Sequence, residues 1–206
     1  MSTTRSHWDA VWADRDPASV SWYQAEPSVS LGLIAALAVD RADPIIDVGG
    51  GMSSLTTSLV RTGHRDLTVL DIAQAALDAL DASLRAEHGS HEVRLVHADV
   101  LDWQPARSYR LWHDRAVNHF LIDAEDRRRY VELAGATVSS GGHLLLASFA
   151  ADGPDECSGL PVHRADDAAL AAEFDASFDL ARIRHELHRT PWQTTQSFHY
   201  LLLRRR

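Results

Sequence analysis

The stretch Pro44–Ser54, PIIDVGGGMSS, runs from an apolar segment through three consecutive glycines into a segment with helical character. A glycine turn between a strand and a helix is typical of a site where the backbone approaches a ligand closely, and in dinucleotide-binding proteins it holds a diphosphate. Asp47 stands two residues before the first glycine. Its carboxylate would repel a diphosphate, because like charges about 4 Å apart cost roughly 1 kcal/mol in water and more in a partly buried site. We therefore expect a ligand that is cationic near this turn.

The regions around this stretch alternate between strand-like and helix-like patterns. Strands are predicted at residues 44–49, 66–73, 92–100, 109–117 and 143–150, and helices at residues 28–39, 53–63, 74–89, 124–142 and 166–174. This alternation favours an α/β fold with a parallel sheet and right-handed crossovers. Two further strands, 178–189 and 197–205, are separated by a segment too short for a helical crossover, so we expect them to be antiparallel neighbours.

Length and composition set bounds on the class of protein. The chain has 206 residues, 45% of them hydrophobic, which suits one sizeable core. We expect a single domain over residues 1–206, with a cap at 1–43 and a core at 44–206. The net charge of −9 argues against a nucleic-acid partner. The lack of a long apolar run and of a signal-peptide pattern, together with the single cysteine, predicts a cytoplasmic protein with no membrane partner.

Two further acids follow the ends of predicted strands. Asp71 lies about twenty residues past the glycines, where a carboxylate can accept hydrogen bonds from both hydroxyls of a ribose. Asp99 ends the next strand, where it can accept the exocyclic amine of adenine, and the N–H of Val100 can reach a ring nitrogen. S-Adenosylmethionine fits this set of acids, because it carries an α-ammonium, a sulfonium and an adenosine but no phosphate.

At these residues the chain resembles the class I S-adenosylmethionine-dependent methyltransferases. IIDVGGGMSSL resembles their first motif, VLDIA the ribose-binding acid, HADVLDW the adenine-edge motif and YRLWHDRAVNHFL the fourth-strand motif beside the methyl acceptor. The resemblance implies a Rossmann-like, doubly wound seven-stranded sheet that is mostly parallel and has a C-terminal antiparallel hairpin strand. It also implies that the cofactor is bound by Trp22, Tyr23, Asp47, Gly49, Gly50, Gly51, Ser53, Asp71, Ile72, Asp99 and Val100.

One position departs from the family pattern. Many members have a third glycine where this chain has Ser53. A serine is small enough for the turn, and its hydroxyl can cap the helix that follows.

The N-terminal segment is rich in aromatic residues, among them Trp8, Trp12, Trp22 and Tyr23. These side chains either only pack, or form a flap over the carboxyl edge of the sheet, where ligands bind in open α/β folds. The segment VSWYQAEPSVSL resembles the opening of small bacterial methyltransferases and of some lysine methyltransferases, in which it covers the methionine end of the cofactor. By that resemblance Trp22 and Tyr23 belong to a cofactor lid.

Candidate catalytic residues gather at the end of the fourth strand. Asp114 is expected beside the sulfonium and the acceptor, with His113 or His119 as a general base. The alternative is that His113 pairs locally and His119 packs beneath Phe120. Arg115 can pair with Asp114 or with an acidic substrate. No Pro-Pro pair follows Asp114, as it does in enzymes that methylate nucleobase amines, which argues against DNA or RNA as the acceptor.

Two residues further along are candidates for the acceptor pocket. Cys157 lies in a long polar loop at residues 152–164, where it can hold a soft substrate or simply pack. Trp192 can wall the pocket or lie in an exposed turn. His185 and His188 fall on opposite faces of a predicted strand, and we expect no metal site.

The sequence therefore predicts an S-adenosylmethionine-dependent methyltransferase that acts on a small-molecule acceptor, with a thiol or other soft nucleophile ranked first. A protein lysine N-methyltransferase is the alternative among enzymes. A module that binds S-adenosylmethionine without catalysis is the alternative from another class, and a nicotinamide-dependent reductase is disfavoured by the charge of Asp47.

Overall fold

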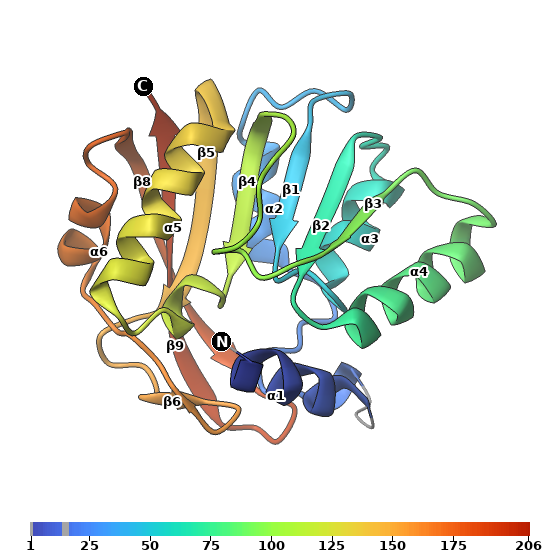
Figure 1. Ribbon diagram of the computed structural model, residues 1–206, viewed down its shortest axis with the longest axis horizontal. Coiled ribbons are helices and arrows are strands. Elements are labelled where there is room, and N and C mark those ends of the chain that lie inside the picture. The colour runs from blue at the N-terminus through green and yellow to red at the C-terminus, as the bar shows by residue number, and fades with distance from the viewer. Residues whose placement is uncertain (1, 14–16) are drawn as a thin grey trace.

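A twisted seven-stranded sheet forms the centre of the computed structural model, which describes residues 2–13 and 17–206 (Figure 1). The strands stand in the order β3-β2-β1-β4-β5-β9-β8. Their bounds are β1 (Ile45–Val48), β2 (Leu67–Asp71), β3 (Arg94–His97), β4 (Tyr109–Arg115), β5 (Val138–Phe149), β8 (Phe178–Arg189) and β9 (Thr195–Arg205). All pairs are parallel except β5 with β9 and β9 with β8, which confirms the predicted α/β fold and its antiparallel hairpin.

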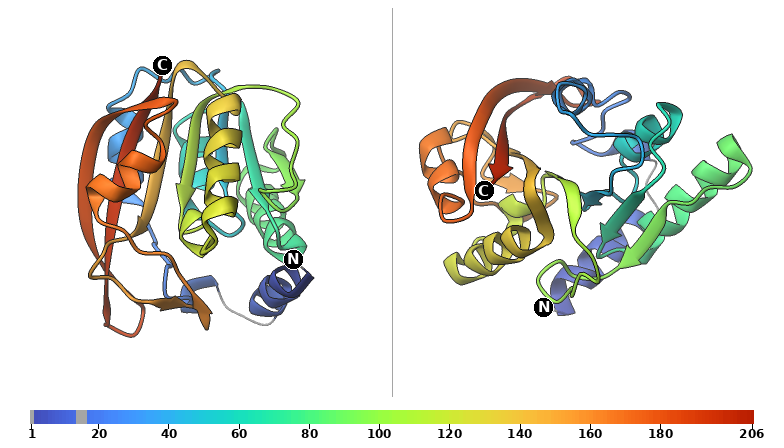
Figure 2. Two further views of the ribbon diagram at one scale, coloured as in Figure 1. Left: turned by 60° about the vertical axis from the view of Figure 1, so that its left-hand side comes forward. Right: turned by 90° about the horizontal axis from the view of Figure 1, so that it is seen from above.

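Helices cover both faces of the sheet (Figure 2). The longer helices are α1 (Ser2–Ala13), α2 (Ser28–Ala35), α3 (Ser54–Arg61), α4 (Gln74–His88), α5 (Ala124–Thr137) and α6 (Asp167–Glu173). Short elements are η1 (Pro17–Ser19), η2 (Asn118–Phe120) and the two-stranded ribbon of β6 (Glu156–Cys157) and β7 (Leu160–Pro161). No helix in the described ranges is long and apolar enough to cross a bilayer.

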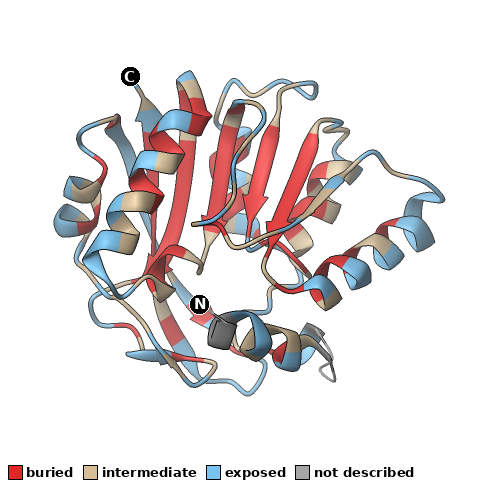
Figure 3. Cartoon of the chain, in the orientation of Figure 1, coloured by how far each residue is buried: buried red, intermediate tan, exposed pale blue. Residues whose placement is uncertain are grey.

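The central strands of the sheet are buried (Figure 3), and their successive residues belong to two different hydrophobic clusters. Ile45 and Leu111 pack with α2 and α3, whereas Ile46 and Trp112 pack with α5 and α6. This follows from the two-residue period of a strand, and apolar side chains on both faces are what a sheet covered on both sides requires.

The carboxyl ends of the parallel strands meet at the lower edge of the sheet in Figure 1, where α1 and the β6–β7 ribbon lie. The first element was not predicted as a helix. The spacing of Trp8 and Trp12 was the available signal, because residues four apart share one face of a helix.

The prediction of a helix through residue 142 was wrong. Helix α5 ends at Thr137, and β5 begins with the next residue. Gly141 has φ +72, and the register of β4 with β5 shifts nearby, so these glycines belong to an irregularity in the strand. A Cβ on Gly142 would lie 2.8 Å from the carbonyl oxygen of Arg110.

Candidate functional site

Two adjoining cavities lie at the carboxyl edge of the sheet. The large cavity has a volume of about 270 Å³ and the small cavity of about 60 Å³. Residues that line both are Trp12, Trp22, Val48, Gly49 and Arg115. Asp71, Asp99 and Val100 line only the large cavity, and Asp47, Tyr23 and Ser53 only the small one. One continuous ligand can therefore extend from the acids of β2 and β3 to the glycine turn after β1.

Glycine is required at all three positions of this turn, because other parts of the chain leave no room for a Cβ atom. Gly49 has φ +66, and a Cβ there would lie 2.0 Å from Cγ2 of Val117. A Cβ on Gly50 would lie 2.5 Å from the carboxylate of Asp47, and one on Gly51 2.5 Å from Cβ of Ala76. The turn is thus packed against the end of β4 on one side and α4 on the other, which leaves its backbone exposed to the cavities.

Replacing Gly49 by alanine is expected to weaken binding of S-adenosylhomocysteine at least tenfold in a calorimetric titration. The left-handed backbone costs a non-glycine residue about 1–2 kcal/mol, and the new methyl group must displace Val117, which lines the large cavity. Gly89→Ala is the matched control, because Gly89 has φ +73 with no atom within 4 Å of the added Cβ. Equal affinities of the two variants would show that Val117 does not couple the turn to the cavity.

Ser53 caps the helix after the turn. Its hydroxyl accepts a hydrogen bond from the N–H of Leu55 at 3.1 Å. The departure from a third glycine at this position therefore supplies a helix cap.

Asp71 stands at the end of β2 with both oxygens already used by the chain. Oδ2 accepts from the N–H of Gly51 at 3.0 Å, and Oδ1 from the N–H of Ala73 at 2.8 Å. Each carboxylate oxygen has two lone pairs, so each can accept one more donor. Burial raises the pKa of Asp71 to about 6, although these N–H groups act in the opposite direction. The arrangement fits a ribose with two hydroxyl donors.

Asp99 and its neighbours form the far end of the large cavity. Oδ1 of Asp99 accepts from the N–H of Leu101 at 3.0 Å, which fixes the loop after β3 and leaves Oδ2 for another donor. Ile72 and Val100 line the same end with apolar surface. This combination of an acceptor with apolar walls fits the edge and faces of an adenine ring.

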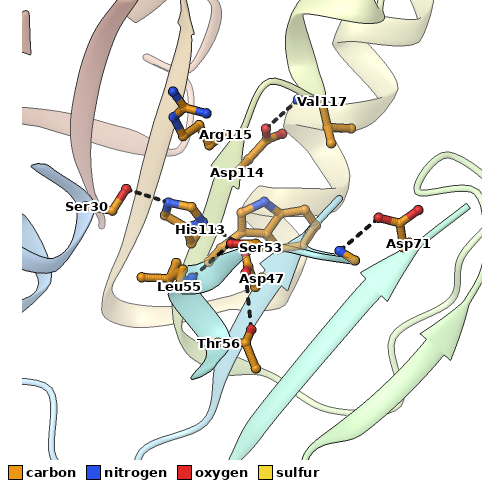
Figure 4. Close-up of polar contacts among 12 residues, drawn as sticks. Ser30, Asp47, Ser53, Leu55, Thr56, Asp71, His113, Asp114, Arg115 and Val117 are labelled. Atoms are coloured by element: carbon orange, nitrogen blue, oxygen red, sulfur yellow. Dashed lines mark hydrogen bonds and ion pairs between the residues drawn. The ribbon is translucent and has the colours of Figure 1, made fainter. Parts of the chain in front are cut away.

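Asp47 is the first member of a buried chain of polar groups that borders the small cavity (Figure 4). Oδ1 of Asp47 lies 2.7 Å from Nδ1 of His113, and Nε2 of His113 lies 2.9 Å from the hydroxyl of Ser30. Oδ2 accepts from the hydroxyl of Thr56 at 3.2 Å. Asp47 and His113 are direct neighbours in the pairing of β1 with β4, which explains their contact. His113 therefore orients Asp47 and has no ring nitrogen free to act as a base.

Asp114 points to the other face of the sheet and does not line either cavity. It is fully buried, and its oxygens accept from the hydroxyl of Tyr130 at 2.5 Å and from the N–H groups of Val117 and Asn118 at 2.9 and 3.1 Å. Burial raises the pKa of Asp114 to about 6. Because successive residues of a strand alternate in direction, His113 and Asp114 cannot face the same site. The expectation that Asp114 contacts the reacting atoms disagrees with this geometry.

His119 and Trp192 also lie away from both cavities. His119 is fully buried between the rings of Phe120 and Phe149, at centroid distances of 4.4 and 4.7 Å, and burial lowers its pKa to about 3. Trp192 is 56% exposed in the turn between β8 and β9. His119 therefore packs in the core, and Trp192 lies in an exposed turn, which were the alternatives to a role in the site.

Aromatic side chains close the cavities from the N-terminal side. Trp22 contacts Trp8 and Trp12 edge to face at 5.9 and 6.0 Å, and Trp8 contacts Phe120 at 5.1 Å. Tyr23 lies at the rim of the small cavity with 36% of its surface exposed. This arrangement corresponds to a flap at the carboxyl edge of the sheet, rather than to aromatic side chains that only pack.

The large cavity is also lined by residues that the sequence analysis did not identify. Phe120 and Leu121 come from η2 and the residue after it, and Ala116 and Val117 from the turn that precedes η2. No sequence signal marked these residues: the turn depends on Ala116, a non-glycine residue with φ +74, and a backbone angle cannot be read from a sequence. Cys157 and Arg115, which the sequence analysis proposed for the acceptor pocket, also line the large cavity.

Metal binding has no geometric support in residues 2–13 and 17–206. No group of three or more histidine, cysteine, aspartate or glutamate side chains there is arranged to hold an ion. His188 is buried and bonded to the carbonyl of Ser21 at 2.8 Å, while His185 is exposed, as their odd spacing on a strand requires.

Comparison with known proteins gives a family and a set of structures with the same fold. A family model described as a methyltransferase domain matches residues 45–142. Search of curated proteins gave no match. A structure reported for the conversion of a disulfide bond into a thioacetal group during echinomycin biosynthesis has 17% identity and a TM-score of 0.79, covering 98% of this chain and 92% of the other.

Two N-methyltransferase structures are similarly related. The NodS protein of Bradyrhizobium japonicum WM9, in complex with S-adenosylhomocysteine, has 17% identity and a TM-score of 0.72, with 98% of each chain covered. The 1,6-didemethyltoxoflavin-N1-methyltransferase of Burkholderia thailandensis, also with S-adenosylhomocysteine, has 19% identity and a TM-score of 0.71, covering 99% of this chain and 85% of the other. At these identities the structures establish the fold, and the family model covers slightly less than half of the chain. Residues 45–142 therefore form a methyltransferase domain within a chain that has the class I fold, and S-adenosylmethionine is the cofactor in this family.

Proposed function

We propose that this enzyme transfers a methyl group from S-adenosylmethionine to a small-molecule acceptor through a soft nucleophile, a thiol or another chalcogen. The observation that carries the proposal is the lack of a ready base among the described residues of the large cavity near Arg115, Phe120 and Leu121, where we place the acceptor. Besides the acids assigned to the adenosine, the titratable groups of this cavity are Arg115, Cys157 and Asp126. The carboxylate of Asp126 is already paired with the guanidinium of Arg129 at 3.2 Å. Arginine stays protonated, and burial raises the pKa of Cys157 to about 11, so its thiol is neutral.

The nature of the nucleophile follows from this lack of a base. An aliphatic amine has a pKa near 10.4 and must lose a proton before it reacts, whereas a thiol with a pKa near 8.5 is partly ionised at neutral pH. The cofactor supplies an electrophilic methyl group on a sulfonium with a good leaving group. The thiolate forms the new carbon–sulfur bond with its own electron pair, and the pair of the broken bond stays on the sulfur of S-adenosylhomocysteine.

The protein's contribution in this scheme is orientation and exclusion of water. The glycine turn, Asp71 and Asp99 hold the adenosine, and Asp47 accepts from the α-ammonium. The tryptophans of the N-terminal segment cover the junction of the two cavities. A covered cavity of about 270 Å³ that also receives the adenosine suits a small acceptor. A lysine side chain of a folded protein needs an open approach and a base, so the protein-methyltransferase alternative has less support.

Release of S-adenosylhomocysteine from a matched series of acceptors tests the proposal. With phenylmethanethiol, phenylmethanol and phenylmethylamine, we expect kcat/KM for the thiol to exceed the other two by at least tenfold at pH 7.5. Asp71→Ala, which lacks the proposed ribose acceptor, serves as the inactive control. Faster turnover of the alcohol or the amine, or transfer of labelled methyl only to proteins of a lysate, would contradict the proposal.

A further inference from the structure

Arg115 is a buried cation with part of its hydrogen-bonding capacity unused. Its side chain is 9% exposed. Nε donates to the hydroxyl of Tyr200 at 3.1 Å, and Nη1 donates to the carbonyl of Trp22 at 3.0 Å. Nη2 is buried and has no hydrogen-bond partner. Buried donors in folded proteins are nearly always paired, so the free N–H groups of Nη2 indicate a missing ligand.

The nearest carboxylate does not satisfy Nη2. Oε2 of Glu186 lies 4.0 Å away, which is too far for a hydrogen bond. The two oxygens of Glu186 already accept from the hydroxyl of Tyr200 at 2.5 Å and from the amide of Gln24 at 2.9 Å. Cys157, on the same cavity wall, is held as a neutral thiol by its burial and adds no negative charge.

The guanidinium is held in place without this missing ligand. Its central carbon lies 4.4 Å from the ring centroid of Phe198, in addition to the bonds to Tyr200 and Trp22. A planar guanidinium that is fixed by stacking and two hydrogen bonds presents its remaining donors in a defined direction. Arg115 is therefore prepared to bind before a ligand arrives.

Arg115 lies where the two cavities meet, which is where we expect the reacting atoms. It lines both cavities, together with Gly49 and Trp22. When the adenosine occupies the large cavity and the amino acid end the small one, the sulfonium lies where the two meet. The acceptor nucleophile must lie in line with that sulfur, on the side formed by Arg115, Val117 and Phe120.

We propose that Nη2 of Arg115 binds the anionic nucleophile of the acceptor and so replaces a general base. The inference rests on the proposed function, because it assigns the acceptor as a molecule that reacts as an anion. A cation beside a thiol favours its ionised form, and a charge-assisted hydrogen bond also fixes the direction of the attacking sulfur. The proton of the thiol passes to water before the transfer step.

The carboxylate of the cofactor is the other anion that Nη2 can reach, and binding measurements separate the two. Sodium thiocyanate serves as a soft anion and is titrated into the complex with S-adenosylhomocysteine, which has no methyl group to transfer to it, with chloride adjusted to constant ionic strength. We expect Arg115→Gln to bind thiocyanate at least tenfold more weakly than the wild type. Affinities for S-adenosylhomocysteine and for 5′-methylthioadenosine, which lacks the amino acid end, should each stay within threefold.

Arg205→Gln is the matched control. The guanidinium of Arg205 also lies near a phenylalanine ring, 5.9 Å from the centroid of Phe178, and donates to the carbonyls of Gly135 and Ser177. Arg205 ends β9 next to the C-terminus, which Figure 1 marks at the opposite edge of the sheet. It should bind thiocyanate as the wild type does. In wild-type kinetics, a measurement that needs no variant, the methyl thioether of the thiol is followed, because thiocyanate can itself accept the methyl group. Thiocyanate should compete with the thiol and not with S-adenosylmethionine.

Three results would overturn the inference. The first is unchanged thiocyanate affinity in Arg115→Gln, and the second is competition of thiocyanate with S-adenosylmethionine. The third is a tenfold loss of affinity for S-adenosylhomocysteine with 5′-methylthioadenosine unaffected, which would assign Nη2 to the cofactor's carboxylate. If the wild type methylates no thiol, the proposed function fails, while the thiocyanate titration still reports on Arg115.

Discussion

Replacing Asp114 by alanine is expected to lower the free energy of unfolding by about 3–5 kcal/mol, measured by urea denaturation. Three donors converge on this carboxylate, from Tyr130, Val117 and Asn118, and all would lose their acceptor inside the protein. The turn after β4 would loosen as well, because Asp114 holds the backbone there while Ala116 adopts φ +74. Ala116 and Val117 line the large cavity, so activity would fall because the wall of the cavity is disturbed.

Asp114→Asn separates this structural role from catalysis. The amide keeps one acceptor oxygen of the same shape, and we expect it to retain most of the stability, with a loss of about 1–2 kcal/mol. Tyr130→Phe removes only one of the three donors and should cost less than Asp114→Ala. A variant Asp114→Ala that stayed within 1 kcal/mol of the wild type but lost activity more than a hundredfold would restore Asp114 as a catalytic residue.

Binding of S-adenosylhomocysteine is expected to weaken about tenfold between pH 7 and pH 5. Burial raises the pKa of Asp71 to about 6, and the ribose hydroxyls bind its ionised form. The carboxylate is therefore almost fully ionised at pH 7 and only about one tenth ionised at pH 5, so protons compete with the ligand as the pH falls. Isothermal titration across this range measures the effect.

Asp71→Ala tests the same carboxylate directly. Loss of two charge-assisted hydrogen bonds should weaken binding by at least about a hundredfold, and the residual affinity should no longer fall between pH 7 and pH 5. Asp78→Asn, at an exposed site on α4, is the control that should keep both the affinity and its pH dependence. A wild-type affinity that is constant from pH 5 to pH 8, or Asp71→Ala binding within tenfold of the wild type, would remove Asp71 from the ribose site.

Local patterns were sufficient to predict the order of the elements and the cofactor end of the site. The strand before Gly49, the helix after Ser53 and the acid at Asp71 are properties of short segments, and the parallel sheet brings the carboxyl ends of its strands to one edge. The same patterns misplaced the end of α5, because glycines that interrupt a strand resemble glycines that stop a helix.

The sequence by itself determined that this chain builds an α/β sheet with a glycine turn, and that acids rather than phosphate-binding groups surround the turn. Only the tertiary structure decided the roles of the three consecutive residues at the end of β4. His113 is fixed by Asp47 and Ser30, Asp114 by Tyr130, and Arg115 by Tyr200 and Trp22. The physical reason is that adjacent side chains of a strand point to opposite faces, and their partners come from segments far away in the chain. The spacing of residues along the sequence does not specify which partners meet there.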